Sequence, residues 1–333
     1  MSDGFVWFEG IPFPVVDFTP EHMREVQENF VFKDEDVLTL SFPKSGTNWL
    51  IEILSLIFSK GDPKWVQSVP IWERSPWLET MYGYKSLKDK EGPRFITSHV
   101  PIHLFPKSVF KSKAKVIYLI RNPRDILVSG YFFWIISNFV KKPESLEQYF
   151  EWFIQGNAKS YDSSKCARHC ASNCAHKSEH NRGVPAFTEF VIHPLFLPST
   201  PTHAVAFGSW FDHIRGWTSM KGKENFLILS YEELKQDTRS AVQKLCQFLG
   251  KKLEPEELNS VLKNSSFQVM KENKMSNYTL LRGWLLDQNN GSFLRKGISG
   301  DWKNYFTVAQ AEVFDKIFQE KTADLPQELF PWE

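Results

Sequence analysis

The chain has 333 residues, 42% of them hydrophobic and 24% charged, and its 40 Lys and Arg residues against 39 Asp and Glu give a formal net charge of +1. This composition is ordinary for a globular protein, and the small net charge argues against a nucleic-acid-binding surface and restricts anion binding to local sites. The N-terminus lacks a basic segment followed by an apolar run, and no apolar stretch approaches the length of a membrane span. We therefore expect a cytoplasmic (cytosolic) protein that binds neither nucleic acid nor a membrane.

Short apolar runs alternate with polar loops and helical patterns along the chain. The runs are "VLTLSF" (37–42), "RFITSH" (94–99), "KVIYLI" (115–120) and "NFLILS" (225–230). Such alternation predicts an α/β fold with a central parallel sheet flanked by helices, in which ligands bind at the carboxyl ends of the strands. Polar residues follow each of the four runs, so we expect the functional site at that edge of the sheet.

The loop "PKSGTNW", which follows the first run, has the residues of an anion-binding turn. Gly46 permits a tight turn whose backbone N–H groups, together with the N-terminus of the next helix, can face an anion. Lys44 adds a full charge, and Ser45 and Thr47 add hydroxyl donors. The usual nucleotide loop, GxxxxGK[ST], has two glycines and places its lysine after the second. The alternative is a strand-to-helix turn that binds nothing.

Two further basic groups are candidate anion ligands. Arg121 directly follows the third run, and its planar guanidinium suits phosphate oxygens. Arg124 is the weaker candidate because it could form a local ion pair with Asp125. The basic turn "RKG" at residues 295–297 would usually be a solvated surface, and it becomes a ligand only if the fold brings it to Arg121.

His99 and several aromatic residues also lie beside the polar loops. A lone histidine is more often structural, but at a strand end facing an anion loop it can act as a proton acceptor. Trp49, Tyr231 and Phe267 are adjacent to polar loops, where they either belong to the core or stack on an adenine ring.

The sequence shows no convincing carboxylate at the end of an apolar strand to hold Mg²⁺. Phosphoryl transfer normally requires a metal because the moving group is highly charged. A sulfuryl group carries less negative charge, so a lysine and hydrogen-bond donors could suffice. Lys44 precedes the single glycine of its loop, whereas the lysine of the usual nucleotide loop follows the second glycine. This position of the lysine and the missing carboxylate both favour sulfuryl transfer over the alternative of a nucleotide-dependent kinase.

Several segments resemble, in order, the sequence hallmarks of the cytosolic sulfotransferases. They are "FPKSGTNW", "RNPRDILVSGYFF", "LSYEELKQD", "NSSFQVMKENKMSNYTLL" and "LRKGISGDWKNYFTVAQAE". The N-terminal "MSDGFVWFEGIPFP", with "SVPIWERSPW" and the closing "LPQELFPWE", is similar to the hydroxysteroid (bile-salt) branch. The resemblance covers nearly the whole chain except residues 158–204.

The resemblance implies a single α/β domain over residues 1–333, related to the P-loop nucleotide kinases, and a sulfotransferase that works without a metal. It implies that the donor is 3′-phosphoadenosine 5′-phosphosulfate and that the acceptor is the hydroxyl of a steroid, bile acid or similar apolar alcohol. By motif position, His99 would be the general base, and Lys44 would stabilise charge on the bridging oxygen during in-line transfer. The stretch "KNYFTVAQAE", from Lys303 to Glu312, matches the family's KxxxTVxxxE dimer motif, so a homodimer is expected.

The same resemblance assigns the remaining site residues. The residues expected to bind the donor are Lys44, Ser45, Gly46, Thr47, Asn48, Trp49, Arg121, Ser129, Tyr231, Ser265, Phe267, Met270, Arg295, Lys296 and Gly297. The family's acceptor pockets are apolar, and the candidates for this pocket are Trp72, Trp77, Phe133 and Trp134.

Residues 158–204 depart from the family pattern, and we interpret them as a loop-like or disordered insertion beside the acceptor pocket. The insertion either forms a flap that reshapes acceptor access, or it disturbs the pocket and leaves a catalytically impaired nucleotide- or steroid-binding homologue. Cys166, Cys170 and Cys174, with three histidines nearby, suggest a zinc site. Structural zinc sites favour paired CxxC-like spacing, which is missing here, so an unstructured segment is the favoured interpretation.

Overall fold

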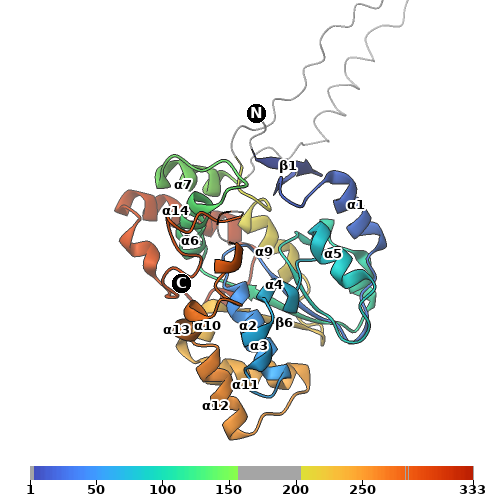
Figure 1. The fold of residues 1–333 in the computed structure, drawn as a ribbon. Coiled ribbons are helices and arrows are strands. Elements are labelled where there is room, and N and C mark those ends of the chain that lie inside the picture. Colours follow the sequence, from blue (N-terminus) through green and yellow to red (C-terminus); the bar gives the residue numbers. More distant parts are fainter. Residues whose placement is uncertain (1–3, 157–203, 282, 284, 333) are drawn as a thin grey trace, which may run out of the picture.

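The sheet at the centre of the molecule is parallel, as the sequence predicts. The computed structural model of the chain describes residues 4–156, 204–281, 283 and 285–332 (Figure 1). Within these residues the sheet has the strand order β4-β3-β5-β6. Its strands are β3 (Val37–Ser41), β4 (Phe95–Ser98), β5 (Lys115–Ile120) and β6 (Phe226–Ser230). They coincide with the four predicted runs, so the predicted α/β class is confirmed.

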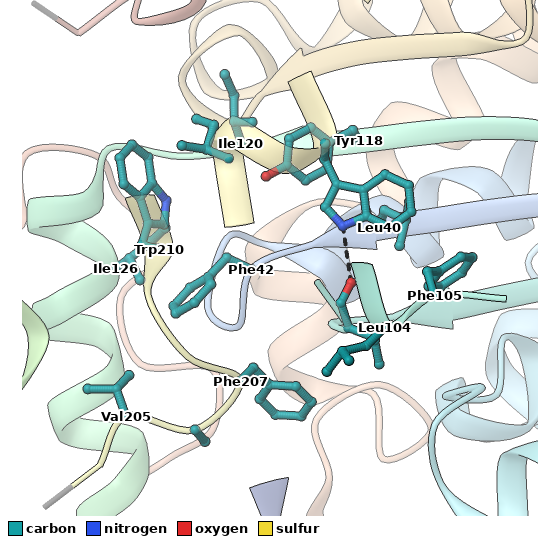
Figure 2. Close-up of a cluster of buried hydrophobic side chains, with 14 of the residues drawn as sticks. Leu40, Phe42, Leu104, Phe105, Tyr118, Ile120, Ile126, Val205, Phe207 and Trp210 are labelled. Carbon is teal, nitrogen blue, oxygen red and sulfur yellow. Dashed lines mark hydrogen bonds between the residues drawn. The ribbon is translucent and has the colours of Figure 1, made fainter. Parts of the chain in front are cut away.

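Both faces of the sheet are covered, which explains why apolar residues follow one another in a strand such as β5 (KVIYLI) instead of alternating with polar ones. Every residue of β3 is buried. Because side chains alternate across a strand, Leu38 and Leu40 join the core on one face, while Val37 joins the core on the other. Figure 2 shows part of the first core, which includes Leu40 and Tyr118 from the sheet.

Helices from distant parts of the chain cover these two faces. The helices on the first face are α1 (Pro20–Asn29), α6 (Pro123–Ile136), α7 (Leu146–Gln155), α9 (Trp210–Thr218) and α14 (Val308–Thr322). The helices on the second face are α2 (Thr47–Phe58), α11 (Thr238–Leu249) and α12 (Pro255–Asn264). In Figure 1, α11 and α12 lie at the bottom of the view, and α6, α7 and α14 lie at the upper left.

The other described elements are short and surround the sheet. They are the hairpin of β1 (Phe5–Phe8) and β2 (Ile11–Pro14), the helices α3 (Lys64–Ser68), α4 (Ile71–Arg74), α5 (Met81–Lys88), α10 (Tyr231–Gln236) and α13 (Phe267–Glu272), and the 3₁₀ turns Ile102–Leu104, Lys107–Lys111, Thr279–Leu281, Asp301–Asn304 and Gln327–Leu329. The segment before α5 runs along the outer edge of the sheet, where the Leu78 N–H donates to the Thr97 carbonyl (2.8 Å) and the Thr97 N–H donates to the Pro76 carbonyl (2.9 Å).

Some predictions fall on residues that the structure does not describe. Of the segment 158–204, only Ala204 lies within the described ranges, where it is buried. The loop-like insertion and the zinc site at Cys166, Cys170 and Cys174 therefore stay predictions, as does the single domain over the whole chain. Among the described helices, none combines the length and apolar character that a membrane crossing requires.

Candidate active site

The loop between β3 and α2 is held in a conformation that leaves the start of α2 open. Lys44 and Gly46 both have left-handed backbone angles, with φ of 69° and 102°. A β-carbon at Gly46 would lie 2.6 Å from the ring of Tyr231, so only glycine fits this turn. Gly46 is the N-cap of α2 and supplies no side chain to bond the first N–H groups. These donors and the positive end of the helix dipole are therefore available to an anion.

Two arginines, Arg121 and Arg295, lie near this loop, and its own Lys44 is the third cationic side chain. The Arg121 guanidinium donates from Nη1 to the Lys44 carbonyl (2.9 Å) and from Nη2 to the Ile298 carbonyl (3.1 Å). Desolvation, followed by the nearby charges of Arg121 and Arg295, lowers the pKa of Lys44 to about 7. The buried Arg121 Nε has no hydrogen-bond partner among the described residues. Mutually repelling cations and an orphaned donor are the features expected of a site that an anion completes.

The basic turn at residues 295–297 lies beside Arg121, which is the condition under which the sequence predicts it to be a ligand. Ile298, the acceptor of the Arg121 bond, directly follows it. Arg295 Nη2 and Lys296 Nζ contact the two carboxylate oxygens of Asp301 at 2.7 and 2.8 Å. Asp301 therefore fixes the turn.

Aromatic rings form a slot next to these cations. The Trp49 and Tyr231 rings meet edge to face with their centroids 5.5 Å apart. The Trp49 indole N–H donates to the Ser265 carbonyl (2.8 Å), which ties the slot to the end of α12. Arg121 lies 4.2 Å from the centroid of the Tyr231 ring. Phe267 lies against Gly297, where an added β-carbon would approach its ring to 2.3 Å.

His99 follows β4 and is oriented by the neighbouring strand. Its Nδ1 lies 2.8 Å from the Ser41 carbonyl, which can only accept, so Nδ1 carries the proton and Nε2 is left with a free lone pair. Desolvation is the largest effect on the His99 pKa and, with Lys44, lowers it to about 4, against the Ser41 bond, which raises it. Trp77 and Phe207 lie near the imidazole, with ring centroids at 6.2 and 5.4 Å. A neutral imidazole near pH 7 can take a proton on Nε2.

A cavity of about 730 Å³ brings most of the predicted residues together. Its lining includes the predicted residues Lys44, Gly46, Thr47, Asn48, Trp49, Trp72, Trp77, His99, Arg121, Ser129, Phe133, Trp134, Tyr231, Phe267, Met270, Arg295, Lys296 and Gly297. Ser45 and Ser265 do not line it. The Ser45 hydroxyl is buried without a partner among the described residues, and the Ser265 hydroxyl donates to the Val261 carbonyl.

The cavity wall also contains residues that the sequence did not indicate. Lys44 Nζ lies 4.1 Å from the centroid of Phe133 and 4.4 Å from that of Phe293. Phe293 packs against Tyr278, which also lines the cavity, with centroids 4.3 Å apart and ring planes tilted by 36°. Phe207 is in the wall as well, with a left-handed φ of 67°. In the described part of the chain, no group of three or more His, Cys, Asp or Glu side chains is arranged to hold a metal ion.

The fold and the cavity define an α/β protein with a cationic site at the carboxyl edge of its parallel sheet, and comparison with known proteins gives its family. Residues 34–326 match the family model described as the sulfotransferase domain. The chain is 60% identical over 333 residues to "Sulfotransferase 2A1" of Macaca fascicularis and 56% identical over 333 residues to "3-beta-hydroxysteroid sulfotransferase" of Cavia porcellus. These alignments cover 100% of this chain and 100% and 99% of the relatives. The chain belongs to the sulfotransferase family.

A solved structure agrees with this assignment. The crystal structure of mouse sulfotransferase SULT7A1 complexed with PAP superposes with a TM-score of 0.72 at 25% identity and covers 99% of each chain. The predicted enzyme class, a sulfotransferase that uses 3′-phosphoadenosine 5′-phosphosulfate, is therefore confirmed. None of these matches favours the alternative of a catalytically impaired homologue.

Proposed function

We propose that this enzyme transfers the sulfuryl group to the hydroxyl of a hydroxysteroid, bile acids included as steroid alcohols. One of the relatives is named for its action on 3-beta-hydroxysteroids. The walls of the cavity away from the cations are largely apolar, with Trp72, Trp77 and Phe133 among them. Flat aromatic side chains suit a rigid, fused-ring alcohol because they bury its faces while the reacting hydroxyl stays at the polar end of the cavity.

The donor occupies the polar end in this proposal. The loop from Lys44 to Trp49 holds the 5′-phosphosulfate, and the Trp49 ring flanks the adenine. The 3′-phosphate is bound by Arg121, Ser129 and the turn of Arg295, Lys296 and Gly297. The adenosine is enclosed by Tyr231, Ser265, Phe267 and Met270. Ser45 and Ser265 do not line the cavity, so in this proposal they act through their neighbours, as when the Ser265 carbonyl holds the Trp49 indole.

The reaction then needs two groups of this chain near the transferred sulfur. His99 Nε2 accepts the proton of the acceptor hydroxyl, whose oxygen attacks sulfur in line with the leaving phosphate. Lys44 stabilises the charge that develops on the bridging oxygen as the sulfur–oxygen bond breaks. The observation that carries this proposal is the pairing of β3 with β4, where Leu40 is opposite Ser98. It brings the loop with Lys44 and the base His99 to the same mouth of the cavity.

Product formation from the sulfonate donor and a panel of steroid alcohols, without added Mg²⁺, tests the proposed reaction. We expect His99→Ala to lose turnover while donor binding, measured by calorimetry, stays unchanged. Lys44→Ala should lower both donor affinity and rate. His103→Ala is the matched control because His103 is exposed and lies outside the cavity lining. Normal turnover by His99→Ala would remove histidine from the mechanism, and a normal rate for Lys44→Ala would contradict the role of the loop.

We further propose a cytosolic homodimer that assembles through Lys303 to Glu312. Val308 lies in this segment at the start of α14, and 76% of its surface is exposed. A single exposed apolar residue is ordinary on a protein surface, so the proposal rests on the match of this segment to the family's dimer motif, within which Val308 would be the apolar contact. Analytical ultracentrifugation of the purified protein tests the dimer, and a monomer at all concentrations would exclude it.

A further inference from the structure

The Glu79 side chain takes the place of a backbone hydrogen-bond acceptor where the segment of residues 76–78, which runs along the edge of β4, turns away from that strand. The ladder between residues 76–78 and β4 continues with the His99 N–H as its next donor. That N–H donates to Glu79 Oε1 (2.9 Å). Thr80 then caps α5, with its hydroxyl accepting from the Gly83 N–H (2.9 Å), so the chain turns away from the sheet. A side-chain carboxyl therefore holds the backbone of the proposed base.

Accepting the bond from the His99 N–H does not by itself require an ionisable side chain. Glu79 is fully buried, with 0% of its surface exposed, and its Oε2 has no partner among the described residues. Desolvation raises the pKa of Glu79 to about 7, although the hydrogen bond from the His99 backbone N–H lowers it. A glutamine would accept the same bond without the penalty of burying a charge. A buried carboxyl with an orphaned oxygen requires another explanation.

The surroundings of His99 suggest that explanation. The His99 carbonyl accepts from His213 Nε2 (3.2 Å), and His213 Nδ1 accepts from the Tyr118 hydroxyl (2.9 Å). With Nδ1 bonded to Ser41, the imidazole has only Nε2 left to react. The titratable groups that the described structure places around His99 are Glu79 from the edge segment, Lys44 from the loop, His213 from α9 and Tyr118 from β5 through His213. Of these, Glu79 is the one that bears negative charge near neutral pH.

We propose that Glu79 is a positioning residue for His99, which fixes the His99 backbone through the amide and stabilises the imidazolium that forms during transfer. The proton leaves the acceptor hydroxyl for His99 Nε2, the hydroxyl oxygen bonds to sulfur, and the electron pair of the broken sulfur–oxygen bond stays on the departing phosphate. A carboxylate that bonds the backbone N–H of the same residue, in buried surroundings, offsets part of the positive charge gained in that step. This inference rests on the proposed role of His99 as the base.

Glu79→Gln removes the negative charge of the side chain but keeps the hydrogen bond to the His99 backbone, because the amide oxygen still accepts from the His99 N–H. The measurement is kcat/KM for an uncharged steroid alcohol at saturating donor, between about pH 5.5 and 8.5. In the wild type we expect the rate to fall as the pH drops through about 7, where Glu79 becomes protonated. Burial lowers the pKa of His99 to about 4, so protonation of His99 should affect the rate at lower pH than protonation of Glu79 does. Saturating donor keeps Lys44 next to an anion and therefore protonated.

We expect Glu79→Gln to lower kcat/KM on the order of tenfold, which corresponds to about 1.4 kcal/mol of transition-state stabilisation, and to remove the acid limb near pH 7. Donor affinity should stay within about twofold, because Glu79 does not line the donor end of the cavity. Glu35→Gln makes the same chemical change at an exposed position and should leave rate and profile unchanged.

The outcomes separate this inference from the function on which it rests. If His99→Ala is inactive but Glu79→Gln has the wild-type rate and acid limb, the role of Glu79 is wrong and the proposed mechanism survives. If His99→Ala retains turnover, the proposed mechanism itself is wrong. A wild-type profile that is flat from about pH 5.5 to 8.5 overturns the role of Glu79 without any variant, so misfolding of Glu79→Gln cannot hide the answer.

Discussion

Gly297→Ala should weaken donor binding through a single contact. Gly297 has a φ of +66°, and a β-carbon there would lie 2.3, 2.7 and 2.8 Å from Cδ2, Cε2 and Cγ of Phe267. A relaxed carbon–carbon contact is about 3.5–4.0 Å, so the ring would have to move by more than about 1 Å. Phe267 encloses the adenosine in our proposal, and its displacement would therefore open that side of the donor site.

The size of the effect follows from two contributions. An alanine forced into the left-handed region costs about 1–2 kcal/mol in stability. Forcing a methyl group into a packed contact adds about 1–3 kcal/mol, part of which is relieved by moving the ring. If about 1.4 kcal/mol of this appears in the donor complex, the dissociation constant rises about tenfold.

Gly250→Ala is the matched control for backbone strain. Gly250 ends α11 with a φ of +64°, and an added β-carbon would meet no described atom within 4 Å. Urea unfolding and calorimetry with 3′-phosphoadenosine 5′-phosphate should show that both variants lose stability, while Gly297→Ala alone loses affinity. Wild-type affinity in Gly297→Ala would refute the placement of Phe267 over the donor. Equal loss in both variants would show that backbone strain, not the ring, controls binding.

Three further results are expected. Because Lys44 has a pKa of about 7 and an anion favours its protonated form, donor affinity should fall about 50-fold from pH 7 to 9, whereas Lys44→Arg should stay flat in the same calorimetric titration. Arg74→Met leaves the buried Glu52 carboxylate without its 2.7 Å partner and should lower the free energy of unfolding by about 3–5 kcal/mol. Lys64→Met, at an exposed pair, should change it by less than about 1 kcal/mol, and equal losses would contradict the difference in burial. Val308→Asp should shift the protein toward monomer in ultracentrifugation, and an unchanged dimer would place the interface elsewhere.

The sheet could be predicted because burial on both faces gives each strand an unambiguous apolar run, as in β3 and β5. The polar residues after each run also predicted that the site lies at the carboxyl ends of the strands. The strand order could not be predicted, because it depends on how distant segments pack. For the same reason the sequence could not decide whether the basic turn before Ile298 reaches Arg121, which the structure shows.

Arg124 illustrates a second limit. The sequence left open a local pair with Asp125, but adjacent residues on a helix do not face each other. Arg124 Nε instead donates to Asp315 of α14 (3.0 Å), and the Asp125 carboxylate accepts from the N–H groups of Gly300 and Trp302 (2.7 and 3.0 Å). Glu79 was missed because its bond to His99 depends on an edge pairing that produces no periodic signal.

Different parts of the chain form the central sheet and the apolar walls of the cavity, and this has a practical consequence. Adjacent strands fix the loop of Lys44 and the position of His99, whereas the apolar walls come from segments that belong to no strand of the central sheet, with Phe18, Trp72 and Phe139 among their side chains. Changes at these three side chains leave the backbone hydrogen bonds that pair β3 with β4 in place. A library confined to the walls is therefore a rational route to sulfating new alcohols with the same chemical machinery.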